Sequence, residues 1–235
     1  MQKITFICGA LLSSMLLACV QAPQIKDDKI TMDKPVIQNL DEVSTDLKKL
    51  QNSLVRISVV DSTHTSFGTG FFFRTNELLI TSEHLFPEKH SCMTQQKCEI
   101  LVGFAKNSKE LSEKTITVDV VLKNPEKDLI FLKVHNPAQF SSVVPLKDKA
   151  KNSNGTLIAI GFFQDQPAIT FSQGQTLTAL PHKPLSTNII VSSGFSGSPV
   201  VNKNGELVGI VSSFRPLEGQ PVGLAQLINT NEESF

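Results

Sequence analysis

Short apolar segments separated by turn residues run along most of the chain from residue 54 onward. They lie at 54–60, 68–75, 77–82, 98–105, 115–123, 129–134, 156–163, 168–180, 188–193 and 198–214. Many short strands at this spacing predict an all-β sandwich or barrel. The clearest hairpin is expected at Asn204-Gly205, because Asn-Gly between two apolar runs is the strongest short hairpin signal.

The first 46 residues have a different pattern. The apolar segment Ile4–Leu17 follows a positively charged start, and it is too short for a membrane span, which needs about 20 residues. It is typical of a signal peptide, predicted at 1–18. Residues 19–46 are mostly polar without sustained periodicity and predict a flexible tether. The folded domain is expected at 47–235, and 41–52 has the spacing of a short helix.

The end of the apolar segment, Leu16-Leu17-Ala18-Cys19, resembles the lipobox of bacterial lipoproteins. The resemblance implies cleavage before Cys19, acylation of its sulfur and a lipid anchor in the membrane of the bacterial cell envelope. The residue after the cysteine is Val20 and not the Asp that resembles an inner-membrane retention signal of such lipoproteins, so outer-membrane attachment is expected. The alternative is an ordinary secretory signal that is cut nearby, with Cys19 incidental.

Charge and composition restrict the partners of the domain. Lys plus Arg and Asp plus Glu both number 22, so the net charge is zero. Zero net charge argues against a nucleic-acid partner and against long-range attraction to an anionic surface. With 40% hydrophobic residues in 235, the chain can bury one sizeable core or two smaller ones.

Export makes the remaining cysteines interpretable. Cys92 and Cys98 form an even pair in an oxidising compartment, and we predict a disulfide between them. Closing this small loop contributes roughly 2 kcal/mol by the chain-entropy estimate. A metal site at the same place would need further ligands, and His90 alone supplies too few, so no metal is expected.

Three polar residues stand next to apolar strands in a pattern suited to acyl transfer. His84 follows the strand in "LLITSEHLF", Asp128 precedes the strand in "DLIFLKV", and Ser196 lies between glycines in "GFSGSPVV". A serine nucleophile needs a base within hydrogen-bond reach and a carboxylate that fixes the tautomer of that base. The chain supplies these groups in the order His, Asp, Ser.

The same segments resemble the chymotrypsin-fold serine peptidases, especially the bacterial HtrA/Deg and glutamyl-endopeptidase branches. "GTGFFF…LLITSEHL" is similar to G-[ST]-G-F…-[LI]-T-x-x-H, "KDLIFLKV" to D-[LI]-A-[LV]-L-[KR], and "GFSGSPVV" to G-[ND]-S-G-[GS]-P. The resemblance covers roughly residues 54–213. It implies an all-β fold of two packed six-stranded antiparallel β-barrels, divided near 140–150, with the active site in the cleft between them.

The resemblance also implies a role for each matched residue. Ser196 would be the nucleophile, His84 the general base and then acid, and Asp128 the residue that orients the histidine. The backbone N–H groups of Gly194 and Ser196 would form the oxyanion hole, and Gly197 is expected to leave room for the substrate. Such an enzyme acts on a polypeptide substrate and needs no cofactor.

The residues matched to the first specificity pocket are Ile190, Val191, Val211, Ser213 and Phe214. No acid stands at the pocket base, where Ile190 lies, which argues against a preference for Lys or Arg at the cleaved position (P1). Val211 stands where the glutamyl endopeptidases have the histidine that selects glutamate at P1, which argues against a preference for Glu. We therefore predict a small or medium aliphatic P1 residue.

Two departures from the family pattern keep other functions open. Phe195 stands where Asn, Asp or Gly is usual, and its side chain is expected to crowd the oxyanion hole or its approach. Glu83 adds a charge beside His84. One alternative is therefore a catalytically silent peptide-binding module of the same fold, and another is an acyl esterase.

Two other hydrolase classes are excluded by the motifs. The G-x-S-x-G elbow of α/β-hydrolases fails at Ser198, and the order His, Asp, Ser differs from theirs. The H-E-x-x-H motif of zinc peptidases is absent from the sequence.

Overall fold

The computed structural model of the chain describes residues 37–38, 45–60, 65–107, 110–140, 146, 155–163, 168–178, 185–217 and 220–227. At some of these, including 214–217 and 220–227, only the backbone is described. The predicted signal peptide (1–18), Cys19 and most of the predicted tether lie outside the described residues. None of the helices in the described part of the chain is both long enough and apolar enough to cross a membrane.

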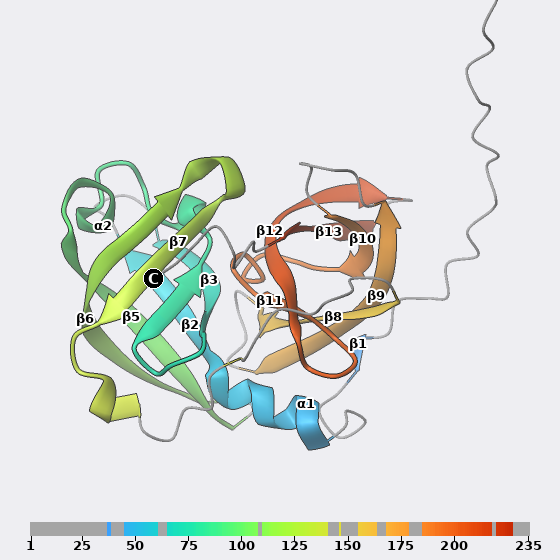
Figure 1. Cartoon of the computed structure of the whole chain (residues 1–235), viewed down its shortest axis with the longest axis horizontal. Coiled ribbons are helices and arrows are strands. Elements are labelled where there is room, and N and C mark those ends of the chain that lie inside the picture. The colour runs from blue at the N-terminus through green and yellow to red at the C-terminus, as the bar shows by residue number, and fades with distance from the viewer. Residues whose placement is uncertain are drawn as a thin grey trace, which may run out of the picture. The chain divides into compact units, whose positions relative to one another are not determined.

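Six antiparallel strands form a closed barrel in the order β2-β3-β4-β7-β6-β5 (Figure 1). Their bounds are β2 Leu54–Val60, β3 Thr65–Phe72, β4 Leu78–Thr81, β5 Lys97–Asn107, β6 Glu110–Asn124 and β7 Leu129–Val134. Short helices connect them or follow them: η3 Glu83–Leu85, α2 Ser91–Thr94, η4 Pro125–Lys127 and η5 Pro137–Phe140. The predicted short helix within 41–52 is present as α1 (Thr45–Leu50), which continues into η2 (Gln51–Ser53) and leads into β2.

The second sheet has the order β1-β9-β10-β13-β12-β11-β8. Its strands are β1 Ile37–Gln38, β8 Thr156–Phe162, β9 Ile169–Thr178, β10 Leu185–Ile190, β11 Pro199–Asn202, β12 Leu207–Leu217 and β13 Gln220–Leu227. An additional β8–β9 pairing curls this sheet onto itself, so β8 to β13 close into a second, barrel-like ring. The hairpin expected at Asn204-Gly205 joins β11 to β12, and Gly205 has a φ of 77°. The predicted all-β, two-barrel fold is confirmed.

The apolar residues are divided among three buried clusters, which explains the continuous apolar strands. In β7, Ile130 and Leu132 face the interior of the first barrel, whereas Leu129 and Phe131 belong to a cluster shared with the second barrel. Successive side chains of a strand point to opposite faces. A strand that is buried on both faces therefore does not alternate between apolar and polar residues. Strand β7 contributes side chains both to the core of the first barrel and to the cluster shared by the two barrels.

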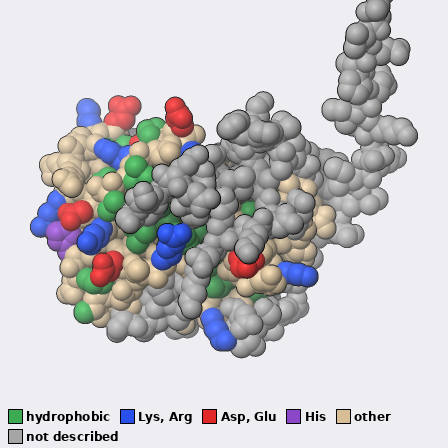
Figure 2. Space-filling model, in the orientation of Figure 1, with side chains coloured by type: hydrophobic (Ala, Val, Ile, Leu, Met, Phe, Trp, Pro, Cys, Tyr) green, Lys and Arg blue, Asp and Glu red, His purple; other side chains and the backbone are tan. Residues whose placement is uncertain are grey.

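The described surface carries both signs of charge. In Figure 2, Lys and Arg side chains are interspersed with Asp and Glu over the described part of one face. Mixed charges of this kind agree with the zero net charge of the sequence.

Candidate active site

Pairing between β4 and β7 brings His84 and Asp128 together. Thr81 at the end of β4 pairs with Ile130 near the start of β7, so the segment that follows β4 lies beside the residue that precedes β7. His84 lies in η3, and Asp128 follows η4 as its C-cap, in the left-handed conformation with a φ of 52°. The N–H of the intervening Glu83 donates to the Asp128 carbonyl at 3.3 Å.

Both carboxylate oxygens of Asp128 contact His84. Oδ1 accepts from the His84 backbone N–H at 2.9 Å, and Oδ2 lies 2.7 Å from Nδ1 of the ring. An ionised carboxylate only accepts hydrogen bonds, so this contact places the ring proton on Nδ1 and leaves the lone pair on Nε2. The Oγ of Ser196 lies 2.9 Å from that Nε2. The structure thus brings the three sequence-predicted residues into one hydrogen-bonded chain.

Ser196 lies in a tight turn that is fixed by backbone hydrogen bonds. The N–H of Phe195 donates to the Ser192 carbonyl at 3.1 Å, and Gly194, with a φ of 100°, occupies the third position of this turn, which favours glycine. The Phe195 carbonyl accepts from the Ser198 N–H at 2.8 Å. Within the described residues, neither the N–H of Gly194 nor that of Ser196 donates to another group of the chain.

Gly197 has a different role from the one expected from the sequence. Its φ is 83°, and a Cβ there would collide with the Thr69 carbonyl oxygen and with Thr81 Oγ1, and would lie 2.8 Å from the Ser82 N. All three groups belong to the first barrel. The expectation that Gly197 leaves room for substrate is therefore wrong: its missing side chain lets the first barrel approach the turn.

The side chain of Phe195 leaves the turn at residues 192–198, called below the oxyanion turn after its proposed role, and enters the core of the second barrel. Its side chain is 1% exposed and belongs to the apolar cluster of the second barrel. Its ring meets the Phe163 ring edge-on at 5.3 Å between centroids. The sequence departure at this position therefore adds core packing and does not crowd the hole.

The family follows from a match to the centre of the chain. Residues 68–210, which include His84, Asp128 and Ser196, match the model of the trypsin-like peptidase domain. The chain belongs to this family.

The curated relatives of this trypsin-like peptidase are longer proteins. It is 30% identical over 167 residues to a protein of Pseudomonas putida (strain W619) named probable periplasmic serine endoprotease DegP-like, a match that covers 68% of this chain and 32% of the relative. A protein of the same name from Ectopseudomonas mendocina (strain ymp) is 27% identical over 165 residues, again covering 68% of this chain and 32% of the relative. The chain thus spans about a third of the length of these relatives.

Solved structures share the fold of this trypsin-like peptidase. The serine endoprotease from Yersinia pestis superposes with a TM-score of 0.58 at 18% identity, over 76% of this chain and 60% of the other. The active form of the Rv3671c protease from M. tuberculosis gives 0.60 at 17% identity, over 83% and 87%. At this identity the likeness extends to the fold alone.

The residues predicted for the P1 pocket lie in different environments. Val191 and Val211 are buried in the apolar cluster of the second barrel. Ile190 is half-buried and Ser213 is exposed, whereas the side chain of Phe214 lies outside the described part. Ile190 and Ser213 are therefore the described members with surface left for a ligand.

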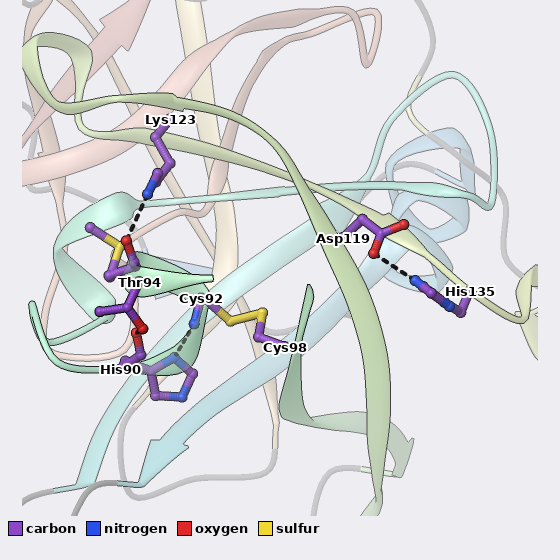
Figure 3. The surroundings of a disulfide bond; sticks show 8 residues. His90, Cys92, Thr94, Cys98, Asp119, Lys123 and His135 are labelled. Carbon is purple, nitrogen blue, oxygen red and sulfur yellow. Dashed lines mark hydrogen bonds and ion pairs between the residues drawn. A yellow bond between two sulfur atoms is a disulfide. The ribbon is translucent and has the colours of Figure 1, made fainter. Parts of the chain in front are cut away.

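The predicted cysteine pair forms a disulfide (Figure 3). It joins Cys92 of α2 to Cys98 of β5, and both cysteines are buried with Leu85 in the core of the first barrel. His90 Nδ1 accepts from the Cys92 N–H at 3.1 Å, so this histidine caps α2. Among the described residues, no group of His, Cys, Asp and Glu side chains is arranged to hold a metal ion.

Glu83 experiences opposing electrostatic effects beside the site. Partial burial raises the pKa of its carboxyl above the ordinary value, and the nearby Asp128 carboxylate raises this pKa further. Lys123 and His84 act in the opposite direction. The net shift of the Glu83 pKa is upward, so ionisation of this carboxyl is less favourable in the folded protein than in the unfolded chain.

Sequence reasoning missed one polar residue at this site. Thr69, in β3, is fully buried and makes hydrogen bonds to the turn that carries Ser196. The available signal was the threonine between two glycines in "GTGFFF".

Proposed function

We propose that the protein is a serine endopeptidase that cleaves peptide bonds through Ser196, His84 and Asp128. The observation that carries the proposal is the continuous chain Asp128 Oδ2, His84 Nδ1, His84 Nε2, Ser196 Oγ, with contacts of 2.7 and 2.9 Å. Membership of the trypsin-like peptidase family supports it. So do the relatives that are named serine endoproteases.

In the proposed reaction, Ser196 Oγ attacks the carbonyl carbon of the scissile peptide while His84 Nε2 takes the hydroxyl proton. The oxygen of the tetrahedral intermediate becomes negative and accepts hydrogen bonds from the N–H groups of Gly194 and Ser196. His84 then gives its proton to the leaving amine, and an acyl-enzyme remains on Ser196. Water, activated by the same histidine, releases the acid and restores the serine. Asp128 holds the ring and stabilises the imidazolium throughout.

The P1 residue is proposed to be small or aliphatic. The two described pocket members with accessible surface, Ile190 and Ser213, are uncharged, and Val191 and Val211 behind them are apolar. A library of peptides cleaved by the protein should show Ala, Val or residues of similar size at P1. A profile dominated by Phe, Arg or Glu would contradict this preference.

The test of the activity is labelling of the full chain with a fluorophosphonate, which reacts only with an activated serine. We expect labelling of the parent and none of Ser196→Ala or His84→Ala. Cleavage of a peptide library by the parent then distinguishes a peptidase from an acyl esterase. A folded parent that takes no label would contradict the proposal and favour the silent peptide-binding module.

We also propose a lipid anchor at Cys19 in the bacterial envelope. The lipobox-like Leu16-Leu17-Ala18-Cys19 supports it, as does the word periplasmic in the names of the relatives. Cells fed labelled palmitate should label the parent and not Cys19→Ser, and the variant should leave the membrane fraction. Label that persists in the variant would contradict the anchor.

A further inference from the structure

We infer that the hydroxyl of Thr69 is a positioning group that sets the oxyanion turn from the opposite barrel; this inference rests on the proposed function. Thr69 lies in β3 of the first barrel and is 0% exposed. The turn it contacts lies 125 residues further along the chain, in the second barrel.

The direction of each hydrogen bond at this hydroxyl is fixed by its partners. The backbone N–H of Phe162, in β8, can only donate, and it lies 3.0 Å from Thr69 Oγ1. The carbonyl of Gly194 can only accept, and it lies 2.8 Å away. The single hydroxyl proton must therefore point at Gly194. A Cβ at Gly161 would collide with Ser198 Oγ and would lie 3.0 Å from the same Thr69 oxygen, so glycine at this position leaves room for both side chains.

This bond holds one peptide group of the turn from both sides. The peptide between Gly194 and Phe195 has its carbonyl bonded to Thr69 and its N–H bonded to Ser192. Gly194 has no side chain to restrict its φ and ψ, so bonds on the adjoining peptide groups decide where its own N–H points. Fixing this peptide thus keeps the Gly194 N–H in the hole.

The backbone of Thr69 completes the support. Its N–H donates to the Ser196 carbonyl at 2.8 Å, and its own carbonyl accepts from Thr81 Oγ1 at 2.7 Å. One residue therefore bonds the carbonyls of both residues, Gly194 and Ser196, whose N–H groups are proposed for the oxyanion hole. No substrate atom needs to touch Thr69 for it to affect the rate.

The test compares Thr69→Val, which keeps the shape and loses the hydroxyl, with Thr69→Ser, which keeps the hydroxyl. We expect Val to lower kcat about 10- to 100-fold, the effect of leaving a buried carbonyl unpaired at the transition state, with KM changed less than about threefold. Ser should stay within about threefold of the parent in kcat. If Val does not fold, Thr69→Ala against Thr69→Ser makes the same comparison.

A second readout separates positioning from general weakening. A peptide boronic acid forms a tetrahedral adduct on the serine and uses the oxyanion hole, whereas the amine fragment released by cleavage has no acyl group to place there. Thr69→Val should weaken the boronate by the same factor as kcat and leave binding of this amine fragment unchanged. The control is Ser53→Ala, which removes another buried hydroxyl bonded to a backbone carbonyl (Ser53 Oγ to Leu50 O, 2.6 Å) away from the site. This control should leave both affinities unchanged.

The outcomes distinguish the two proposals. A parent that takes no fluorophosphonate overturns the proposed function itself. A parent that reacts, with Thr69→Val equal to it in kcat and boronate affinity, overturns the role of Thr69 alone. Equal losses in Thr69→Ser and Thr69→Val would also overturn it, because the methyl group would then matter and the hydroxyl would not.

Discussion

The two barrels contribute to the candidate site in different ways. The first barrel supplies side chains: His84 and Asp128 follow and precede paired strands, and both oxygens of Asp128 hold the histidine. The second barrel supplies mainly backbone: Ser196 lies in a turn whose geometry depends on Gly194 and on peptide hydrogen bonds. The His84–Asp128 pair is therefore formed within the first barrel, whereas the turn that carries Ser196 also needs contacts from the first barrel.

The two parts of the candidate site are therefore positioned by different contacts. The His84–Asp128 pair depends on the register of β4 and β7, which are paired strands of the same barrel. The oxyanion turn depends on docking of the barrels, since Thr69 binds it from across the interface. Changes within the first barrel should thus affect proton transfer, and changes at the interface should affect the turn.

The largest expected effect comes from breaking the pair inside the first barrel. Asp128→Asn keeps a residue that tolerates the left-handed conformation, but its amide group favours the wrong histidine tautomer. We expect kcat to fall about 10,000-fold, as for the same change in other Ser-His-Asp enzymes, with little loss of stability. Peptide hydrolysis at neutral pH measures this.

The matched control for that change is Asp119→Asn. Asp119 Oδ1 lies 2.7 Å from His135 Nε2, a second aspartate–histidine pair in the same barrel. Figure 3 shows this pair on the far side of the disulfide from His90. Its loss should leave kcat unchanged. A loss below about tenfold in Asp128→Asn would contradict the assigned role of Asp128.

Sequence patterns predict the local parts of this molecule better than the contacts across it. Strand β7 and the hairpin at Asn204-Gly205 follow from residues close together in the sequence, and the three candidate catalytic residues from family motifs. The roles of Thr69 and Gly197 depend on a neighbour in the other barrel. No local pattern encodes that neighbour, so Thr69 was missed and Gly197 was misassigned.

The inward position of Phe195 has the same explanation. The sequence places a large apolar residue beside Ser196 but does not say which side of the turn it occupies. The second barrel offers an apolar cluster with Phe163 at its edge, and burial of a phenylalanine there is favourable. Tertiary packing, and not the motif, decides its direction.

The next largest effect should come from breaking the barrel interface at Gly197. Gly197→Ala adds both backbone strain at a φ of 83° and a collision with Thr69 and Thr81. We expect the free energy of unfolding to fall by about 3–5 kcal/mol, the sum of strain and overpacking. Denaturant unfolding measures it.

Gly155→Ala is the control that isolates the strain. Gly155 has a φ of 102°, but no atom of the described residues lies within 4 Å of a Cβ built there. It should cost only about 1–2 kcal/mol. Equal losses in the two variants would show that Gly197 is not constrained by the opposite barrel.

A smaller effect is expected from the disulfide, which acts within the first barrel alone. Cys92→Ala with Cys98→Ala removes a cross-link between residues six apart in sequence. The free energy of unfolding should fall by about 2 kcal/mol by the chain-entropy estimate. The kcat of the folded fraction should be retained, because neither cysteine contacts the three candidate residues. A large loss of kcat without a loss of stability would mean that the disulfide orients His84 directly.

The smallest expected effect is electrostatic and tests whether the Glu83 carboxylate destabilises the folded protein. The pKa of Glu83 is raised in the folded protein, first by burial and then by Asp128. As the pH rises above its ordinary pKa of 4.5, the unfolded chain loses this proton first, so the folded state becomes relatively less stable through that window. Glu83→Gln removes this penalty. The variant should be more stable than the parent near pH 7 by less than about 0.5 kcal/mol, and the difference should vanish near pH 4. Thermal unfolding at both pH values measures this difference in stability, and Glu88→Gln at an exposed position is the control. If Glu83→Gln is less stable than the parent at pH 7, the Glu83 carboxylate is needed beside His84. This departure from the family pattern would then stabilise the His84–Asp128 pair of the first barrel.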